Sequence, residues 1–195
     1  KVGERPVREG KFLRSDWGGL PKYRPNEFGK VLNNDFFGGN LAGITEKLDY
    51  LRGLGVTIIY LNPIFEAYSN HRYDTGDYMK IDPLLGDNED LDKLVSEAGK
   101  RGIRIVLDAV FNHTGSDSRY FIRCGTYDSV GAYQSPYSPY YDWYTFQNYP
   151  DVYDSWWGID TLPAVNESSP SYQEFIFGEN GVLKTWLRHG VGGYR

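Results

Sequence analysis

A carboxylate, an amide and an imidazole follow one apolar run of this chain within six positions. Residues 105–107 (Ile-Val-Leu) come after Gly102 and lead directly into Asp108, and Asn112 and His113 stand just beyond it. A continuous apolar run is typical of a parallel strand buried on both faces, and such strands carry functional groups at their C-terminal ends. Asp108 is therefore a candidate site residue. The alternative is that Asp108 forms a structural ion pair and that His113 is an ordinary buried histidine. The neighbouring segments are needed to distinguish the two interpretations.

The elements that must position these groups alternate along the chain. Apolar residues at three- and four-residue steps predict helices, and β-branched runs predict strands. The first two expected elements are a helix over 41–54 that Gly53 and Gly55 end and a strand over 56–61. A helix capped at 87–89 and closing at Gly99 or Gly102 then leads to the strand before Asp108. The last two are a helix over 171–188 interrupted near 178–181 and a strand-like segment over 190–195. This order predicts a right-handed α/β winding, either a barrel or an open doubly wound sheet.

The remaining segments give the expected organisation. Residues 1–39 are rich in Gly, Pro and Asn and are predicted to form an irregular segment, whereas residues 40–111 hold the regular units. Residues 112–168 are rich in Tyr, Pro, Ser and Trp and far exceed an ordinary strand-to-helix connection, which indicates an inserted subdomain or lid. Residues 169–195 return to a helix and a strand.

The composition indicates a globular protein without a nucleic-acid partner. At 195 residues and 40% hydrophobic content, the chain suffices for one sizeable domain or two small ones. Its 21 basic and 26 acidic residues give a net charge of −5 with no Lys/Arg cluster. No apolar stretch approaches membrane-spanning length, and no phosphate-binding GxGxxG or GxxxxGKS/T motif follows a strand. One cysteine, Cys124, excludes an intrachain disulfide and leaves the compartment open.

Aromatic residues are the compositional outlier. The chain has 17 Tyr, 10 Phe and 5 Trp, yet its mean hydropathy is only −0.55, so many rings are expected at polar surfaces. Flat apolar faces with a polar edge suit stacking on sugar rings, as they suit protein interfaces. For any single tyrosine, burial in the core is the better expectation.

Five motifs in order resemble glycoside hydrolase family 13, the α-amylase family. They are 55–65 (GVTIIYLNPIF), 71–78 (HRYDTGDY), 108–113 (DAVFNH), 162–166 (LPAVN) and 190–195 (GVGGYR). The resemblance runs from Phe36 onward and is strongest to the neopullulanase, cyclomaltodextrinase and amylopullulanase branch. It implies a (β/α)8 barrel of which this chain supplies strands 2 to 4 with their helices. The 112–168 insertion after strand 3 would be the B domain, and 1–39 would follow a strand 1 that lies upstream.

The resemblance also implies roles for particular residues. His71, Tyr73, His113 and Arg195 match residues that bind the sugar at the cleavage point, with Tyr73 stacking on the ring and the imidazoles contacting hydroxyls. Asp108 matches an aspartate that holds the arginine, and a carboxylate facing a guanidinium can form a bidentate pair.

The implied chemistry is retaining hydrolysis of α-glucosidic bonds in starch, pullulan, cyclodextrin or maltooligosaccharides, by a pair of carboxyl groups about 5 Å apart. The family's nucleophile follows the arginine by two positions, so it is expected just after Arg195, and no catalytic carboxylate is expected in this chain. The chain is therefore expected to be part of a longer polypeptide whose remainder completes the barrel. Alone it should be inactive and should associate through unpaired sheet edges.

The family also suggests calcium and leaves alternatives for the function. Gly38 could offer a carbonyl and Asn40 an amide oxygen, and Asn112 matches a calcium ligand in classical α-amylases, although calcium takes six to eight oxygens. No organic cofactor is expected. A transglycosylase or isomerase of the same family would share this half of the site. An amylase-like transporter heavy chain would share the fold without catalysis, but the four sugar-binding residues together favour an enzyme.

Overall fold

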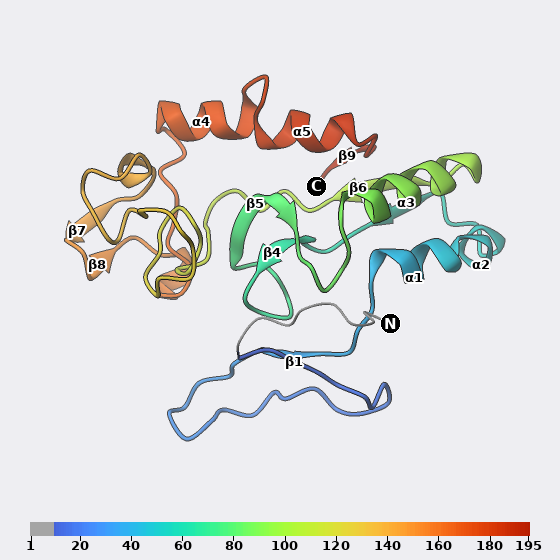
Figure 1. Cartoon of the computed structure of the whole chain (residues 1–195), viewed down its shortest axis with the longest axis horizontal. Helices are drawn as coiled ribbons and strands as arrows, with labels where there is room; N and C mark the ends of the chain where they lie inside the picture. Colours follow the sequence, from blue (N-terminus) through green and yellow to red (C-terminus); the bar gives the residue numbers. More distant parts are fainter. Residues whose placement is uncertain (1–9) are drawn as a thin grey trace.

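The computed structural model, which describes residues 10–195, contains a three-stranded parallel sheet (Figure 1). Its strands, in spatial order, are β3 (Ile58–Tyr60), β6 (Arg104–Leu107) and β9 (Gly193–Tyr194). The register pairs Tyr60 with Val106 and Leu107 with Tyr194, so the three strands end at a common edge. The strand and helix order matches the α/β winding that the sequence predicts, and β6 is the central strand.

The helix expected over 41–54 forms as two shorter helices, α1 (Leu41–Glu46) and α2 (Leu48–Gly53). The Thr45 hydroxyl donates to the Leu41 carbonyl at 3.1 Å. Threonine bonds of this type compete with the helical ladder and bend helices. The break falls at Lys47, and the expected end at Gly53 and Gly55 is confirmed, with Gly55 at a φ of 83°.

The second expected helix is confirmed as α3 (Asn88–Lys100). The Asp87 side chain accepts from the Asp90 backbone N–H at 3.0 Å, and the Asp90 side chain accepts from the Asp87 N–H at 3.3 Å. These reciprocal bonds form a capping box, which satisfies two N–H groups at the start of the helix. The turn after the helix ends at Gly102, with φ at 72°.

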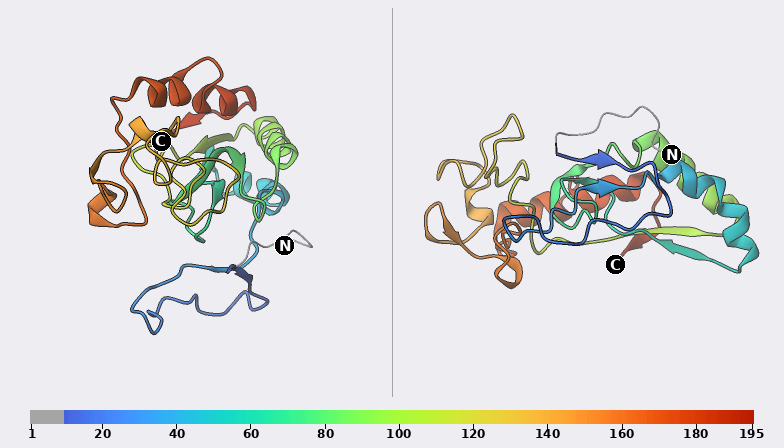
Figure 2. Two further views of the ribbon diagram at one scale, coloured as in Figure 1. Left: turned by 60° about the vertical axis from the view of Figure 1, so that its left-hand side comes forward. Right: turned by 90° about the horizontal axis from the view of Figure 1, so that it is seen from below.

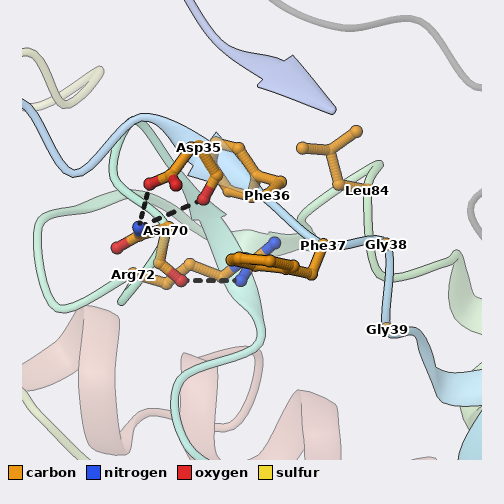
Figure 3. A pocket seen from close by; sticks show the side chains of 8 residues that line it. All are labelled: Asp35, Phe36, Phe37, Gly38, Gly39, Asn70, Arg72 and Leu84. Carbon is orange, nitrogen blue, oxygen red and sulfur yellow. Dashed lines mark hydrogen bonds between the residues drawn. The ribbon is translucent and has the colours of Figure 1, made fainter. Parts of the chain in front are cut away.

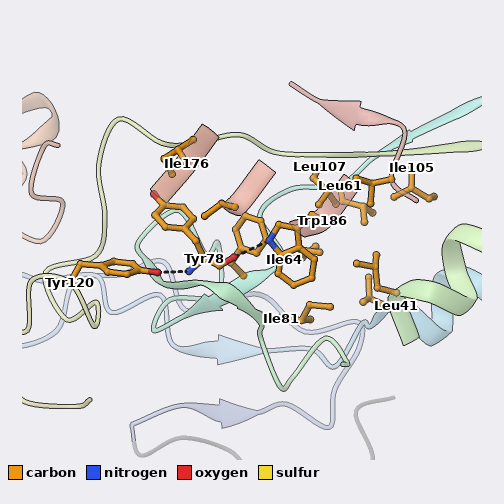
Figure 4. Close-up of a cluster of buried hydrophobic side chains, with 14 of the residues drawn as sticks. Leu41, Leu61, Ile64, Tyr78, Ile81, Ile105, Leu107, Tyr120, Ile176 and Trp186 are labelled. Carbon is orange, nitrogen blue, oxygen red and sulfur yellow. Dashed lines mark hydrogen bonds between the residues drawn. The ribbon is translucent and has the colours of Figure 1, made fainter. Parts of the chain in front are cut away.

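The expected interruption of the third helix is also confirmed, because α4 (Pro170–Phe177) and α5 (Val182–Arg188) are separate and lie end to end along one side of the sheet (Figure 1). A β-carbon at Gly181 would lie 2.7 Å from the Phe175 carbonyl oxygen, so the connection needs glycine there. The buried Trp186 indole donates to the Tyr78 carbonyl at 2.9 Å and fixes α5 to β5 (Thr75–Ile81) (Figure 4).

The core lies between the sheet and the surrounding helices, where apolar side chains from all of them meet (Figure 4). The buried members include Leu41, Leu61, Ile64, Tyr78, Ile81, Ile105, Leu107, Ile176 and Trp186. Burial of such side chains stabilises each by roughly 1.5–3 kcal/mol relative to exposure. β5 pairs antiparallel with β4 (Phe65–Ala67), and its residue Tyr78 contacts the 112–168 segment through Tyr120.

The 112–168 segment gathers at one end of the molecule (Figures 1 and 2), and its aromatic rings pack against one another. Phe121 meets Tyr144 and Tyr153 edge to face, with centroids 4.8 and 4.7 Å apart. Tyr120 connects this cluster to the main core, 5.9 Å from Tyr78. Its regular elements are η1 (Tyr141–Trp143), β7 (Phe146–Asn148), β8 (Val152–Tyr153) and η2 (Trp156–Gly158). Many of the chain's rings are thus core residues.

The N-terminal segment carries a short strand pair. β1 (Phe12–Leu13) and β2 (Asp35–Phe36) pair in parallel, and the long loop between them projects away from the sheet (Figure 2). Residues 1–9 of the expected irregular segment lie outside the described residues. Within 10–195, no helix is both long enough and apolar enough to cross a membrane.

Candidate functional site

Three polar side chains meet where the parallel strands end. Tyr60 is the last residue of β3, Asp108 follows β6, and Arg195 follows β9. The Arg195 N–H donates to the Leu107 carbonyl at 3.0 Å, and the Ala109 N–H donates to the Arg195 carbonyl at 2.8 Å, which fixes Arg195 beside the Asp108 strand. The shared edge follows from parallel pairing, because the carboxyl ends of parallel strands lie together.

Asp108 is buried, with 7% of its surface exposed, and its carboxylate is held by two phenols. The Tyr60 hydroxyl donates to Asp108 Oδ2 at 2.6 Å, and the Tyr73 hydroxyl donates to the same oxygen at 2.9 Å. Hydrogen bonds to an ionised acceptor are roughly twice as strong as neutral ones. Asp108 is therefore an anchor for two tyrosines from different segments of the chain.

Arg195 contacts Asp108 through Tyr60 rather than directly. Arg195 Nη1 donates to the Tyr60 hydroxyl at 3.3 Å, and its guanidinium carbon lies 5.1 Å from the Tyr60 ring centroid. The structure records no ion pair between Asp108 and Arg195, both described residues, so the expected bidentate pair is wrong. The physical reason is that the Tyr60 hydroxyl takes the carboxylate oxygen itself and presents its own oxygen to the guanidinium. This bond raises the pKa of Arg195 further above its ordinary value.

Tyr73 and His71 form one wall of the site from the loop before β5. Desolvation, and next the hydrogen bond to Asp108, raise the pKa of Tyr73 to about 12, so its hydroxyl stays a donor at neutral pH. The His71 ring lies 6.0 Å from the Tyr73 ring at 29°, and its Nδ1 accepts from the Tyr73 N–H at 3.1 Å. The neutral His71 ring therefore carries its proton on Nε2, which remains available as a donor.

The pKa of His71 is lowered, chiefly by desolvation, with Arg72 adding to the effect and Asp74 opposing it. Although His71 is exposed by surface area, the atoms packed around its ring disfavour the imidazolium. We expect a neutral His71 above its ordinary pKa of 6.5.

His113 is buried and bonded at both ring nitrogens. The Asn112 amide lies 2.9 Å from Nδ1, and the Tyr73 carbonyl lies 3.0 Å from Nε2. A neutral ring protonated on Nε2 satisfies both contacts, since Nε2 donates to the carbonyl and Nδ1 accepts from the amide. Burial lowers the pKa of His113, which agrees with this neutral form. A sugar hydroxyl would have to exchange with one of these bonds, so the expected hydroxyl contact stays a prediction.

The structure thus brings His71, Tyr73, His113 and Asp108 into one hydrogen-bonded group, to which Arg195 is joined through Tyr60. Sequence reasoning missed Tyr60, which it assigned only to an apolar strand. Its position at the end of a strand next to the Asp108 strand was the available signal, because a phenol there can reach a neighbouring carboxylate.

The residues expected to bind calcium are Gly38, Asn40 and Asn112, and the structure shows what surrounds each of them. The Asn40 side-chain oxygen accepts from the Gly43 N–H at 2.9 Å and caps α1. Gly38 lies in a cavity of about 280 Å³ with Arg72, a cation, and with Asp35 (Figure 3). Asp35 is buried and already bonded: its carboxylate accepts from Arg14 at 3.2 Å, from the Lys22 N–H at 2.9 Å and from the Asn70 amide at 3.3 Å.

Asn112, the third expected ligand, uses its amide N–H₂ on His113. Residues 10–195 contain no group of three or more His, Cys, Asp or Glu side chains placed to hold a metal. Calcium prefers six to eight oxygens and several carboxylates. Calcium therefore stays a prediction without support from these contacts.

The fold and site define an α/β protein with a polar site at the carboxyl ends of parallel strands, the arrangement typical of enzymes built on such sheets. The chain belongs to the alpha-amylase catalytic domain family, whose model matches residues 10–195. Solved structures of the same family, which has the TIM-barrel fold, superpose on this chain.

Curated relatives and solved structures agree with this assignment. An amylopullulanase of Thermoanaerobacterium saccharolyticum is 48% identical over 195 residues, covering 90% of this chain and 15% of the relative. The type III pullulan hydrolase from Thermococcus kodakarensis has a TM-score of 0.76 at 35% identity, over 95% of this chain and 30% of that one. The cyclic α-maltosyl-(1→6)-maltose hydrolase from Arthrobacter globiformis, in complex with that sugar, has a TM-score of 0.77 at 33% identity, over 97% and 39%. The chain therefore spans well under half the length of these relatives.

Proposed function

We propose that this chain supplies strands 2 to 4 of the catalytic barrel of a retaining glycoside hydrolase that cleaves α-glucosidic bonds. In this proposal β3, β6 and β9 are barrel strands 2, 3 and 4, and residues 112–168 are the B domain inserted after strand 3. Residues 40–111 and 169–195 are then barrel units, and 1–39 follows strand 1. The parallel order β3-β6-β9 and the aromatic packing within the insertion support this assignment.

The observation that carries the proposal is the convergence of Tyr60, Asp108 and Arg195 at one edge of the sheet. In a barrel enzyme the substrate binds at this edge. We infer that Tyr73 stacks against a glucosyl ring, that the free Nε2–H of His71 donates to a hydroxyl, and that the guanidinium of Arg195 faces the reacting carbon's substituents. A cation, a neutral donor and an aromatic face together suit a polar, uncharged ring.

The contacts of Asp108 favour a positioning role over attack on the sugar. One of its oxygens accepts two phenol hydroxyls, at 2.6 and 2.9 Å, and a nucleophile so occupied would have to break both bonds. The reacting carboxylates of the retaining mechanism are accordingly not assigned to Asp108. The nucleophile is expected two positions beyond Arg195.

The test is hydrolysis by the full-length protein of starch, pullulan, cyclodextrin and maltooligosaccharides, with Arg195→Ala as the matched variant. Hydrolysis with retained α-anomeric products, lost by about a hundredfold or more in Arg195→Ala, is expected if the arginine positions substrate. Products longer than the substrate would indicate a transglycosylase. A well-folded full-length protein that turns over none of these substrates would overturn the proposal and favour a non-catalytic amylase-like domain.

A further inference from the structure

Trp157 is a large apolar residue that the fold holds out in solvent, beside the candidate site. Its side chain is 84% exposed, although the protein has an aromatic core next to it. A bulky residue at a positive φ is uncommon and costs roughly 1–3 kcal/mol of backbone strain. Trp157 nevertheless has φ 53° and ψ 27°, inside η2. Strain of this kind persists where the surrounding structure over-determines it.

The surrounding turn does hold Trp157 in place through its neighbours. The Trp156 N–H donates to the Leu162 carbonyl at 2.9 Å, and the Ile159 N–H donates back to the Trp156 carbonyl at 3.0 Å. The Gly158 N–H donates to the Ser155 carbonyl at 3.3 Å. These bonds close the turn on both sides of Trp157 and fix the backbone that presents the indole to solvent.

The two adjacent indoles form a continuous flat surface that reaches the site. The rings of Trp156 and Trp157 are stacked, 4.4 Å apart and 6° from parallel. The Trp156 ring then lies 5.3 Å from the His113 ring, and His113 bonds to the Tyr73 carbonyl. One face of Trp157 is covered by Trp156, which leaves the opposite face open to solvent. The row of rings thus leads outward from the candidate site to an exposed aromatic face.

We propose that Trp157, backed by Trp156, stacks against a glucosyl unit of an α-glucan chain, outside the unit held at the candidate site. The apolar C–H face of a pyranose suits such a ring, and a preformed, rigid aromatic face costs little conformational entropy on binding. This inference rests on the proposed function and names a specificity-determining position for it. It explains why a strained backbone keeps one indole out of the core.

The test compares variants of Trp157 in the full-length protein with maltohexaose as the ligand. Trp157→Ala removes the ring, and Trp157→Gly removes it and also relieves the positive φ, so at least one of them is expected to fold as well as wild type. Trp157→Phe keeps an aromatic face. The matched control is Tyr137→Ala, because Tyr137 is another exposed ring, 96% accessible, in the same insertion.

We expect kcat/KM for maltohexaose to fall about tenfold in Trp157→Ala and Trp157→Gly, which is a typical loss for an aromatic anchor. It should stay within about twofold of wild type in Trp157→Phe and in the Tyr137→Ala control. Values within about twofold of wild type for the Ala and Gly variants would overturn the inference, as would an equal loss in Trp157→Phe.

The outcome separates this inference from the proposed function. A wild-type protein that hydrolyses neither maltohexaose nor starch refutes the proposed hydrolysis. In that case tryptophan fluorescence decides about Trp157: quenching by maltohexaose in wild type that is lost in Trp157→Ala supports the stacking position, and unchanged fluorescence refutes it.

Discussion

At the scale of single residues, Asp108 accepts hydrogen bonds from two phenols, and one of them, Tyr60, also accepts from Arg195. The Tyr60 hydroxyl positions the Arg195 guanidinium, and a phenylalanine at this position would keep the ring while removing that hydroxyl. Tyr60 is thus a positioning residue on β3, whereas the Asp108 carboxylate follows β6. Hydrogen bonds to charged groups contribute roughly 1.5–3 kcal/mol, so this bridge is large enough to measure.

Tyr60→Phe tests the bridge. The variant keeps the ring under the guanidinium and removes the hydroxyl that joins Asp108 and Arg195. In the full-length protein we expect kcat/KM for maltooligosaccharides to fall about tenfold or more, with the loss mainly in kcat. Tyr194→Phe is the matched control, because the Tyr194 hydroxyl bonds the Leu183 carbonyl instead. Equal losses in both variants would show that a general loss of packing is responsible.

His71 gives a pH prediction at the same scale. Its pKa in the folded protein lies below the ordinary 6.5, so between that lower value and 6.5 the unfolded chain binds more protons than the folded one. Stability is therefore expected to fall as the pH drops through this window. His71→Gln should weaken the fall, measured as the free energy of unfolding at pH 8 and pH 5. An NMR-measured His71 pKa above 6.5 would contradict the assignment.

At the scale of elements, the helices show which boundaries the sequence determines locally. The sequence predicted α3 with a cap within 87–89 because the signal there is local: polar residues that can cap a helix, followed by an apolar stripe. It did not predict the split of α1 from α2, because the bond from Thr45 to the Leu41 carbonyl opposes a periodic pattern that continues across the break. The interruption between α4 and α5 was predicted because glycines mark it in the sequence, whereas no glycine or proline marks the break at Lys47.

Asp87→Ala tests the capping box. It removes the acceptor for the Asp90 N–H, and we expect a loss of about 1 kcal/mol in the free energy of unfolding, measured by chemical denaturation. Glu89→Ala is a suitable control on the first turn of the same helix. A loss in the control as large as that in Asp87→Ala would show that first-turn charge, not capping, is responsible.

Gly115→Ala tests the junction between the insertion and β5. A β-carbon at Gly115 would lie 2.6 Å from the Asp74 carbonyl oxygen, and this backbone cannot move cheaply. We expect a destabilisation of about 1–3 kcal/mol, measured as a lower Tm. Gly18→Ala, with nothing within 4 Å of its β-carbon, should stay within about 0.5 kcal/mol of wild type. Equal effects of the two variants would contradict this packing.

The sequence predicted which residues form the site but not how their side chains contact one another. The candidate residues His71, Tyr73, His113, Asp108 and Arg195 do form one group, because strand ends and the loop before β5 converge in space. The sequence could not show that Tyr60 separates Asp108 from Arg195, since that depends on side-chain reach across three strands. Nor could it show that Asn40 is taken by the helix cap.

At the scale of the whole molecule, the three-stranded sheet has one unpaired edge on β3 and one on β9 among the described residues. Ile58 on β3 is 57% exposed. Unpaired edges and exposed apolar strand residues favour association. The 195-residue chain, prepared alone, is therefore expected to self-associate and to show no hydrolysis, measured by light scattering and a starch assay. A stable, active monomer of this length would contradict the barrel assignment.

The central claim is that the strand ends hold a glucosyl unit, and a crystal structure of the full-length protein soaked with a maltooligosaccharide tests it most directly. We expect a glucosyl ring stacked on Tyr73, with a hydroxyl within hydrogen-bond distance of His71 Nε2 and with Asp108 still bonded to Tyr60 and Tyr73. A sugar bound away from these residues, or one whose anomeric carbon is attacked by Asp108, would contradict it.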